Sequence, residues 1–318
     1  MVLASFAILP WGAKGDNLPR LPGAILLTGY LPVITKPGYT RSLSEGSDAR
    51  RAGVTMSLNG EVVAAYRSSA DGLGISTYSV ASEKWTDYRI ALKMHGAIAL
   101  SPDGSKLAVA VREESRESWR LCLIDLKTGA RTFGPNLGQH YMGTRLTWSP
   151  DGHRIAFDMN WVRLDANKAD TSMTIRRTIH ILDLDSGVIS KIADGQSPAW
   201  SPSGEWIAYL HYSEDRETND SIEPPGSNQA CMIHPDGTGL KVLATRSGNS
   251  FRYLFGGKLL DLFMEAPVWS PDSKTILLNK LHDADKTTFD IYLLDLATLK
   301  MARRFRGAPP VYGWAAAK

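Results

Sequence analysis

One short pattern recurs five times along this chain of 318 residues. Its clearest copies read LTWSPDGHRIAF from Leu146 and PAWSPSGEWIAYL from Pro198, and further copies begin at Gly53, Ala97 and Pro267. The residues directly before the turn serine are Met56, Leu100, Trp148, Trp200 and Trp269. Their spacings of 44, 48, 52 and 69 residues are typical of stacked repeat units of four strands each, with insertions.

The local chemistry of the pattern predicts a tight β-hairpin. In Ser-Pro-Asp-Gly the proline presets φ for the second turn position, the aspartate can accept bonds from nearby backbone N–H groups, and glycine suits the fourth position. The apolar run that follows, such as 155–157 or 276–278, is β-branched or aromatic and too short for a helix. We therefore expect a strand, a tight turn and a second, buried strand in every copy.

A third strand recurs after each pair. It starts at Arg120, Ile179, Ala230 and Asp290, with a worn version at Ile75, and polar or glycine turn residues close it before a fourth strand. A four-stranded antiparallel unit of this kind cannot bury both faces of its sheet alone. It must stack on its neighbours, and stacking around an axis gives a β-propeller.

The two ends of the chain complement each other. The segment from Gly23 to Tyr30 resembles a second strand with no first strand before it, whereas Val311 to Lys318 resembles a first strand with nothing after it. Trp314 follows Trp269 by 45 residues, one repeat length. Pairing the two ends would close the ring and remove an exposed sheet edge.

The predicted fold class is therefore an all-β, six-bladed β-propeller of four-stranded antiparallel blades, with five or seven blades as alternatives. Residues 23–318 are expected to form one propeller domain, and residues 1–22 a tail or a weak signal-like segment. Residues 31–51 show no convincing third and fourth strand for the closing blade.

At this point the residues resemble a known family. Trp-Ser-Pro-Asp-Gly, an Ile-Ala-Phe-like strand and then a run like Ile-Tyr-Leu-Leu-Asp, read from Trp148 and Ile291, are similar to the repeat of the TolB-type, WD40-like β-propellers. The resemblance covers residues 53–318. It implies an exported or periplasmic bacterial protein that serves as an interaction platform or as a module beside an enzyme domain. The separate N-terminal α/β domain of TolB does not precede this propeller, so the resemblance implies no specific Tol-Pal role.

Charge and cysteine usage narrow the partners. The formal net charge is +3, with both signs interspersed, so the sequence predicts no nucleic-acid partner. No apolar run reaches the roughly 18 residues that span a bilayer. The basic cluster of Lys300, Arg303, Arg304 and Arg306 is expected on an outer edge strand. The only two cysteines, Cys122 and Cys231, occupy the same repeat position in different blades and are expected to stay unpaired.

Loop lengths predict one elaborated face. Antiparallel strands alternate in direction, so the first and third turns of every blade share one face and the other connections share the opposite one. All long segments, 158–177, 211–228 and 247–266, belong to the second face. They carry aromatic residues and arginines typical of binding hot spots, although 251–266 could instead be a short capping helix. The candidate binding residues are Trp161, Arg163, Phe251, Arg252, Tyr253 and Phe255.

Catalytic motifs are weak. The seven histidines lack metal-site spacing, no Gly-x-Ser-x-Gly elbow occurs, and Asp283, Asp285 and Asp290 lack the rest of a calcium loop. Turn aspartates such as Asp125 and Asp151 are expected to serve structure. The sequence thus predicts no catalytic residue, metal or cofactor, and favours a non-catalytic scaffold for a protein or peptide partner. The alternative is a hydrolase or lyase acting on a sugar, lactone or peptide, with carboxylates converging in the central channel.

Overall fold

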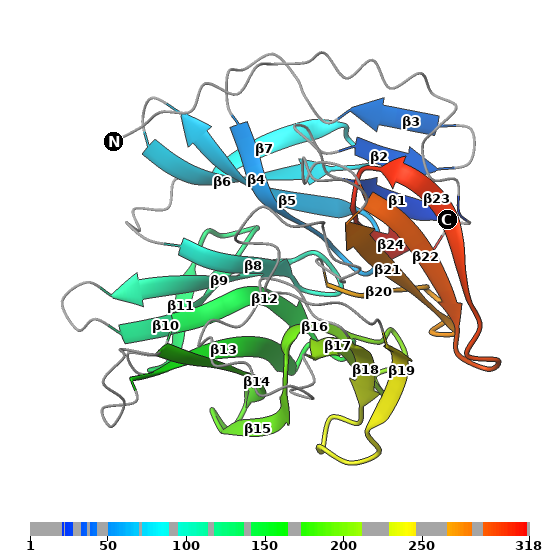
Figure 1. The fold of residues 1–318 in the computed structure, drawn as a ribbon. Coiled ribbons are helices and arrows are strands. Elements are labelled where there is room, and N and C mark those ends of the chain that lie inside the picture. Colours follow the sequence, from blue (N-terminus) through cyan, green and yellow to red (C-terminus); the bar gives the residue numbers. More distant parts are fainter. Residues whose placement is uncertain are drawn as a thin grey trace.

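The computed structural model describes residues 21, 23–27, 33–36, 39–42, 50–69, 72–88, 95–113, 118–136, 141–164, 173–211, 229–245, 266–281 and 289–316. Within these residues the secondary structure consists of strands and turns, and the strands form six four-stranded antiparallel sheets. The sheets are arranged radially around an axis (Figure 1). The protein is an all-β propeller, as the repeat predicts.

Five blades are built from consecutive strands. Blade 1 comprises β4 (Arg50–Met56), β5 (Val62–Ser69), β6 (Gly72–Ser79) and β7 (Lys84–Tyr88). Blade 2 comprises β8 (His95–Leu100), β9 (Lys106–Glu113), β10 (Ser118–Asp125) and β11 (Arg131–Asn136). Blade 3 comprises β12 (Tyr141–Trp148), β13 (Arg154–Leu164), β14 (Met173–Asp183) and β15 (Ile189–Asp194). Blade 4 comprises β16 (Gln196–Trp200), β17 (Ile207–His211), β18 (Gln229–Ile233) and β19 (Lys241–Thr245). Blade 5 comprises β20 (Val268–Trp269), β21 (Thr275–Leu281), β22 (Phe289–Asp295) and β23 (Met301–Ala308).

The remaining sheet, which we call the closing sheet, combines both ends of the chain. Its order is β24 (Val311–Ala315), β1 (Ala24–Leu27), β2 (Val33–Lys36) and β3 (Tyr39–Ser42). Figure 1 shows the red end of the chain beside the blue one, and Trp314 is the Cα partner of Ile25. This pairing was predicted, but β2 and β3 were not. The two strands are only four residues long, which is too short for a repeat to be recognised.

The inner strands form a closed ring. Contacts join β4 to β8, β8 to β12, β12 to β16, β16 to β20, β20 to β24 and β24 back to β4. Each ring neighbour therefore belongs to an adjacent sheet, and β12 lies opposite β24. The predicted tail, residues 1–22, lies outside the described residues except for Leu21, which packs with Val268 and Val311.

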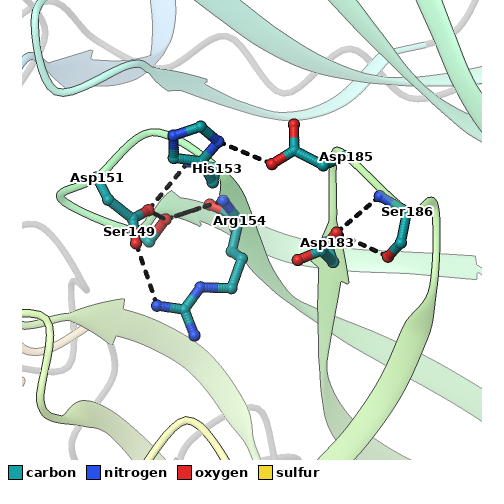
Figure 2. Close-up of polar contacts among 7 residues, drawn as sticks. All are labelled: Ser149, Asp151, His153, Arg154, Asp183, Asp185 and Ser186. Carbon is teal, nitrogen blue, oxygen red and sulfur yellow. Dashed lines mark hydrogen bonds and ion pairs between the residues drawn. The ribbon is translucent and has the colours of Figure 1, made fainter.

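The repeated turn is a hydrogen-bonded unit. In blade 3 the Ser149 hydroxyl donates to the Asp151 carboxylate, the His153 N–H donates to Asp151 Oδ1 over 3.0 Å, and the Arg154 N–H donates to Ser149 Oγ over 2.9 Å (Figure 2). Gly152 has φ of 75°, which a glycine adopts without strain. Asp103 and Asp272 make the same bonds in blades 2 and 5. The structural interpretation of these aspartates is confirmed.

A second aspartate closes the other short turn. Asp183 accepts from the backbone N–H and the hydroxyl of Ser186, over 2.8 and 2.7 Å. Across the two turns His153 Nδ1 lies 2.9 Å from Asp185 Oδ2 (Figure 2). The first and third turns of blade 3 therefore lie on one face, as antiparallel geometry predicts.

The core lies between neighbouring sheets. Phe157, Leu121 and Trp148 belong to one buried cluster that joins blades 2 and 3. The indole nitrogen of Trp148 donates to the Ala99 carbonyl of blade 2 over 3.0 Å, and that of Trp269 donates to the Ala199 carbonyl of blade 4 over 2.9 Å. Trp148 and Trp269 thus each link one inner strand to the preceding one, whereas the indole nitrogen of Trp200 donates to the Gly204 carbonyl of its own turn over 3.2 Å.

Two other predictions about surface and core are confirmed. Cys122 and Cys231 are free and buried. The basic cluster flanks or lies on β23, the outermost strand of blade 5, where Arg303 pairs with Asp290 over 3.1 Å. A helix able to cross a membrane does not occur among the described residues.

One expectation about the loops is wrong in part. Residues 158–177 were expected to form a connecting loop, but β13 and β14 pair over 11 residues, from Arg154 with Asp183 to Leu164 with Met173. The β-branched and aromatic residues of this segment, including Trp161, Val162 and Ile175, favour extended backbone. The two strands therefore continue well beyond the length of their counterparts in the other blades.

Candidate functional site: the axial pocket

A cavity of about 130 Å³ lies on the propeller axis and is lined by all six inner strands. It extends from the middle of these strands to the turns that follow them. The turn end carries one residue from each of four successive sheets, two positions after the recurrent apolar residue. These rim residues are Leu58, Pro102, Pro150 and Pro202. Because Leu58 is 37% exposed, the pocket, which we call the axial pocket, reaches the surface at this face.

The rim is held by bonds between neighbouring turns. The Asn59 N–H of blade 1 donates to the Pro102 carbonyl of blade 2 over 3.2 Å. The Ser203 N–H of blade 4 donates to the Ser273 hydroxyl of blade 5 over 3.0 Å. The turns of blades 1 and 2, and those of blades 4 and 5, are therefore tied to each other as well as being bonded internally.

Arg145 crosses the deep end of the axial pocket. It lies on β12, and its Nη2 donates to the carbonyl oxygen of Tyr312 on β24 over 3.4 Å. The centre of its guanidinium lies 5.4 Å from the centroid of the Tyr312 ring. Because β12 and β24 face each other across the ring, this side chain spans the axis and places a permanent positive charge there.

Asp158 fixes the backbone that carries Arg145. Its carboxylate accepts from the Arg145 N–H over 3.1 Å and from the Ser197 N–H of blade 4 over 3.3 Å. Asp158 is 2% exposed, and a buried carboxylate with two backbone donors is well satisfied. The bond to Arg145 lies at the bulge in β12 between Met142 and Leu146. Through Asp158, the backbone at Arg145 on β12 is therefore tied to Ser197 on the neighbouring inner strand β16.

The sequence contains a signal for Arg145 that motif searching missed. Three positions before the recurrent apolar residue, five of the six sheets have a small or short side chain on or just before the inner strand, and one has arginine. The small or short ones are Gly53, Ala97, Ser197, Ala266 and Val311. Small residues at one level of the ring leave space for a single long side chain to cross.

The lining of the axial pocket is rich in aromatic residues. Four tryptophans, Trp148, Trp200, Trp269 and Trp314, contribute to its walls together with prolines and small polar groups. Among the described residues of the lining there is no carboxylate and no histidine. Across all the described ranges, no group of three or more His, Cys, Asp or Glu residues is placed to hold a metal ion.

The sequence-predicted binding residues lie elsewhere. Trp161 and Arg163 are on β13, opposite Arg176 and Thr174 of β14, near the end of the blade that lies away from the tight turns. Phe251, Arg252, Tyr253 and Phe255 lie outside the described residues, as do Asp283 and Asp285. The proposed cluster of these loops therefore stays a prediction.

Fold and pocket together define a class: a β-propeller with a small aromatic pocket on its axis. No family model matches the chain, and no curated protein matches it. Among solved structures it is similar to TolB from Acinetobacter baumannii, with a TM-score of 0.59 and 14% identity over 91% of this chain and 66% of that one. This chain thus spans just under two thirds of that protein.

Two further solved structures extend the comparison. A putative TolB from Agrobacterium tumefaciens gives a TM-score of 0.57 and 16% identity, covering 93% of this chain and 94% of that one. An oligogalacturonate lyase in complex with manganese gives 0.52 and 17%, covering 92% and 74%. The chain has the fold of the TolB-type β-propellers, and identities this low establish the fold alone.

Proposed function

We propose that this protein is a non-catalytic scaffold that binds a protein or peptide partner. The observation that carries the proposal is the axial pocket, which combines aromatic and proline walls with one guanidinium and, in its described lining, no carboxylate or histidine. Tryptophan and arginine are the residue types that dominate binding energy at interfaces. Aromatic walls with a few polar groups that fix the orientation of a ligand are common in recognition sites.

The opposite face provides a second proposed contact. The paired strands β13 and β14 extend to Leu164 and Met173, so Trp161 and Arg163 lie near the end of the longest hairpin described. Together with Phe251, Arg252, Tyr253 and Phe255 they would form the binding face expected from the sequence. An exported or periplasmic setting, implied by the family resemblance, belongs to the same proposal.

A lyase or hydrolase acting at the channel is the second candidate function. The fold similarity to an oligogalacturonate lyase that binds manganese favours testing it. General acid–base chemistry needs a titratable group within reach of the reacting atoms, and the described lining supplies only Arg145 and Tyr312. Incubation with oligogalacturonate and Mn²⁺, followed by absorbance of the unsaturated product, tests this candidate directly.

Site-specific photocrosslinking tests the binding proposal. A photoreactive amino acid at Leu58 on the rim should give a discrete adduct with a partner in native lysate. The matched control is Leu240, an exposed leucine (59%) beside β19, the outer strand of blade 4, which should give none. A third probe at Trp161 reports on the hairpin face. Absence of an adduct at both Leu58 and Trp161, with the protein folded, would contradict the proposal.

A further inference from the structure

The guanidinium of Arg145 has bonding capacity left inside the axial pocket. An arginine carries five N–H donors in a planar fork. The described residues supply one acceptor, the Tyr312 carbonyl at the long distance of 3.4 Å, and one ring face. At this distance the hydrogen bond is weak. An acceptor with better geometry would therefore displace the Tyr312 carbonyl from the guanidinium N–H donors or bind beside it.

The charge also lies well below the rim. Tyr312 is two positions before Trp314, and the rim prolines are two positions after the same level in their own strands. Four residues of strand at about 3.3 Å each correspond to a depth of roughly 13 Å. The described walls between these levels are aromatic, apolar or small and polar. An anion that enters from the rim therefore reaches Arg145 only at the tip of a narrow extension.

We infer that Arg145 is a subsite for the free C-terminal carboxylate of a peptide or protein that enters the axial pocket end-on. This inference rests on the proposed function, because it names the ligand group that the binding pocket takes. A carboxylate matches the planar fork of a guanidinium and can form two parallel charge-assisted hydrogen bonds with it. The Tyr312 ring and the tryptophan walls lower the exposure of the pair to water and so strengthen its attraction.

Depth favours a chain terminus over an acidic side chain. From Cα to carboxylate a glutamate reaches only about 4 to 5 Å, given ordinary bond lengths. A chain that stays at the rim therefore cannot place an internal glutamate beside Arg145. An extended C-terminal segment advances about 3.3 Å per residue, so its last four residues cover the distance. An internal residue could reach the same depth only if the peptide chain entered the pocket and turned back, which requires room for two strands.

Peptide pools that differ only at the C-terminus test the inference on the full chain. A randomised pool of acetylated pentapeptides without Asp or Glu is made once with a free carboxylate and once with a carboxamide. A third pool carries a carboxamide and one internal Glu. The fraction of each pool retained by the protein after rapid gel filtration is read by mass spectrometry. We expect about tenfold or more retention of the free-acid pool over the amide pool, the usual size for a charge-assisted pair.

Variants locate the effect. Arg145→Met should remove the preference for the free acid, and Arg145→Lys should keep only part of it, because lysine retains the charge without the fork. The matched control is Arg120→Met, since Arg120 also bonds a backbone carbonyl, that of Gly134, and lies over a ring, that of Phe133, but does so towards the outer edge of blade 2. That variant should behave as the unmodified protein does.

The remaining outcomes separate the two proposals. Equal retention of the acid and amide pools would leave the binding function standing and overturn the carboxylate subsite. Retention of the internal-Glu pool at the level of the free-acid pool would also overturn it, in favour of a side-chain ligand. Retention of no pool above a blank column would overturn the subsite together with the axial pocket as the peptide site. The comparison of pools on the unmodified protein needs no variant to fold.

Discussion

Arg145 and Tyr312 lie on opposite inner strands of the propeller, and the guanidinium of the first rests 5.4 Å from the ring centroid of the second. The 167 residues that separate them in sequence make this a contact that only the closed ring creates. It joins blade 3 to the closing sheet directly across the axis, although these two sheets are not neighbours in the ring. One end of the axial pocket consequently carries a guanidinium.

Ring closure makes a first prediction at Asn279. Its side-chain amide donates to the Val311 carbonyl and accepts from the Val311 N–H, both over 2.9 Å, and the residue is fully buried. Asn279→Ala would leave two backbone groups of β24 without partners, so we expect a loss of about 2 to 4 kcal/mol in the free energy of unfolding. Urea denaturation measures it. The exposed Lys127→Ala serves as control and should change stability by less than about 0.5 kcal/mol.

Gly195 makes a second prediction, because it lies where two blades meet. A Cβ at this position would lie 2.7 Å from the Leu210 carbonyl oxygen and 2.6 Å from a ring carbon of Tyr209, and φ is +151°. Gly195→Ala should therefore cost more than about 2 kcal/mol, through clash with backbone as well as strain. Gly187→Ala, with φ of +71° and open space around it, should cost only the roughly 1 to 2 kcal/mol of a left-handed residue. Equal melting temperatures for the two variants would contradict this reading of the junction.

The turn aspartates make the third prediction, about pH. Hydrogen bonds from Ser186 and Thr298 hold the pKa of the Asp183 and Asp295 carboxyls below the usual range, and bonds from Ser101 and Ser270 do the same for Asp103 and Asp272. A pKa that is lower in the folded state gives stability that is complete above the unfolded value, near 3.9, and is lost as pH falls through the folded value.

We therefore expect the urea midpoint to decline as pH falls from about 5 towards 2. In the double variant Asp183→Asn, Asp295→Asn the amide oxygen can still accept the turn bonds, but it does not titrate. That variant should show a shallower decline over the same pH range. A decline as steep as that of the unmodified protein would mean that these turns contribute nothing to the acid sensitivity.

Buried thiols make the fourth prediction. Burial raises the pKa of Cys231 to about 11 and also raises the pKa of Cys122. Since only the thiolate reacts with alkylating agents, both cysteines should resist iodoacetamide at pH 8 in the folded protein and react fully in denaturant. Intact-mass spectrometry counts the adducts. Rapid modification of Cys231 under native conditions would indicate that the space between β17 and β18 opens readily.

The parts of the fold that could be predicted from sequence are those with local causes. Ser149, Asp151 and Gly152 form their turn from neighbours within five residues, so the same letters recur wherever the turn does. The strand that follows is defined by its apolar run. Repeated four-stranded units of this kind indicate a propeller. The pairing of β24 with β1 could be predicted because residues 23–30 resemble a second strand without a first, and residues 311–318 a first strand without a second.

What could not be predicted depends on distant partners or on weak local signals. The strands β2 and β3 have no repeat copy, and only the Pro37-Gly38 pair between them is a turn signal. The sequence of the β13–β14 hairpin predicts a loop, because its polar and charged residues, such as Asp158 and Arg163, mask an extended pattern. Arg145 was missed because its role depends on Tyr312, which only ring closure brings near.

The seam between β1 and β24 also constrains how the molecule comes into being. β1 emerges from the ribosome before its partner strand β24, which follows only after the segment from Leu27 to Val311 has been made. At common translation rates that interval is between about 15 and 60 seconds. During this interval the edge of β1 that pairs with β24 has no partner strand. The axial pocket and the contact between Arg145 and Tyr312 form only when β24 is in place.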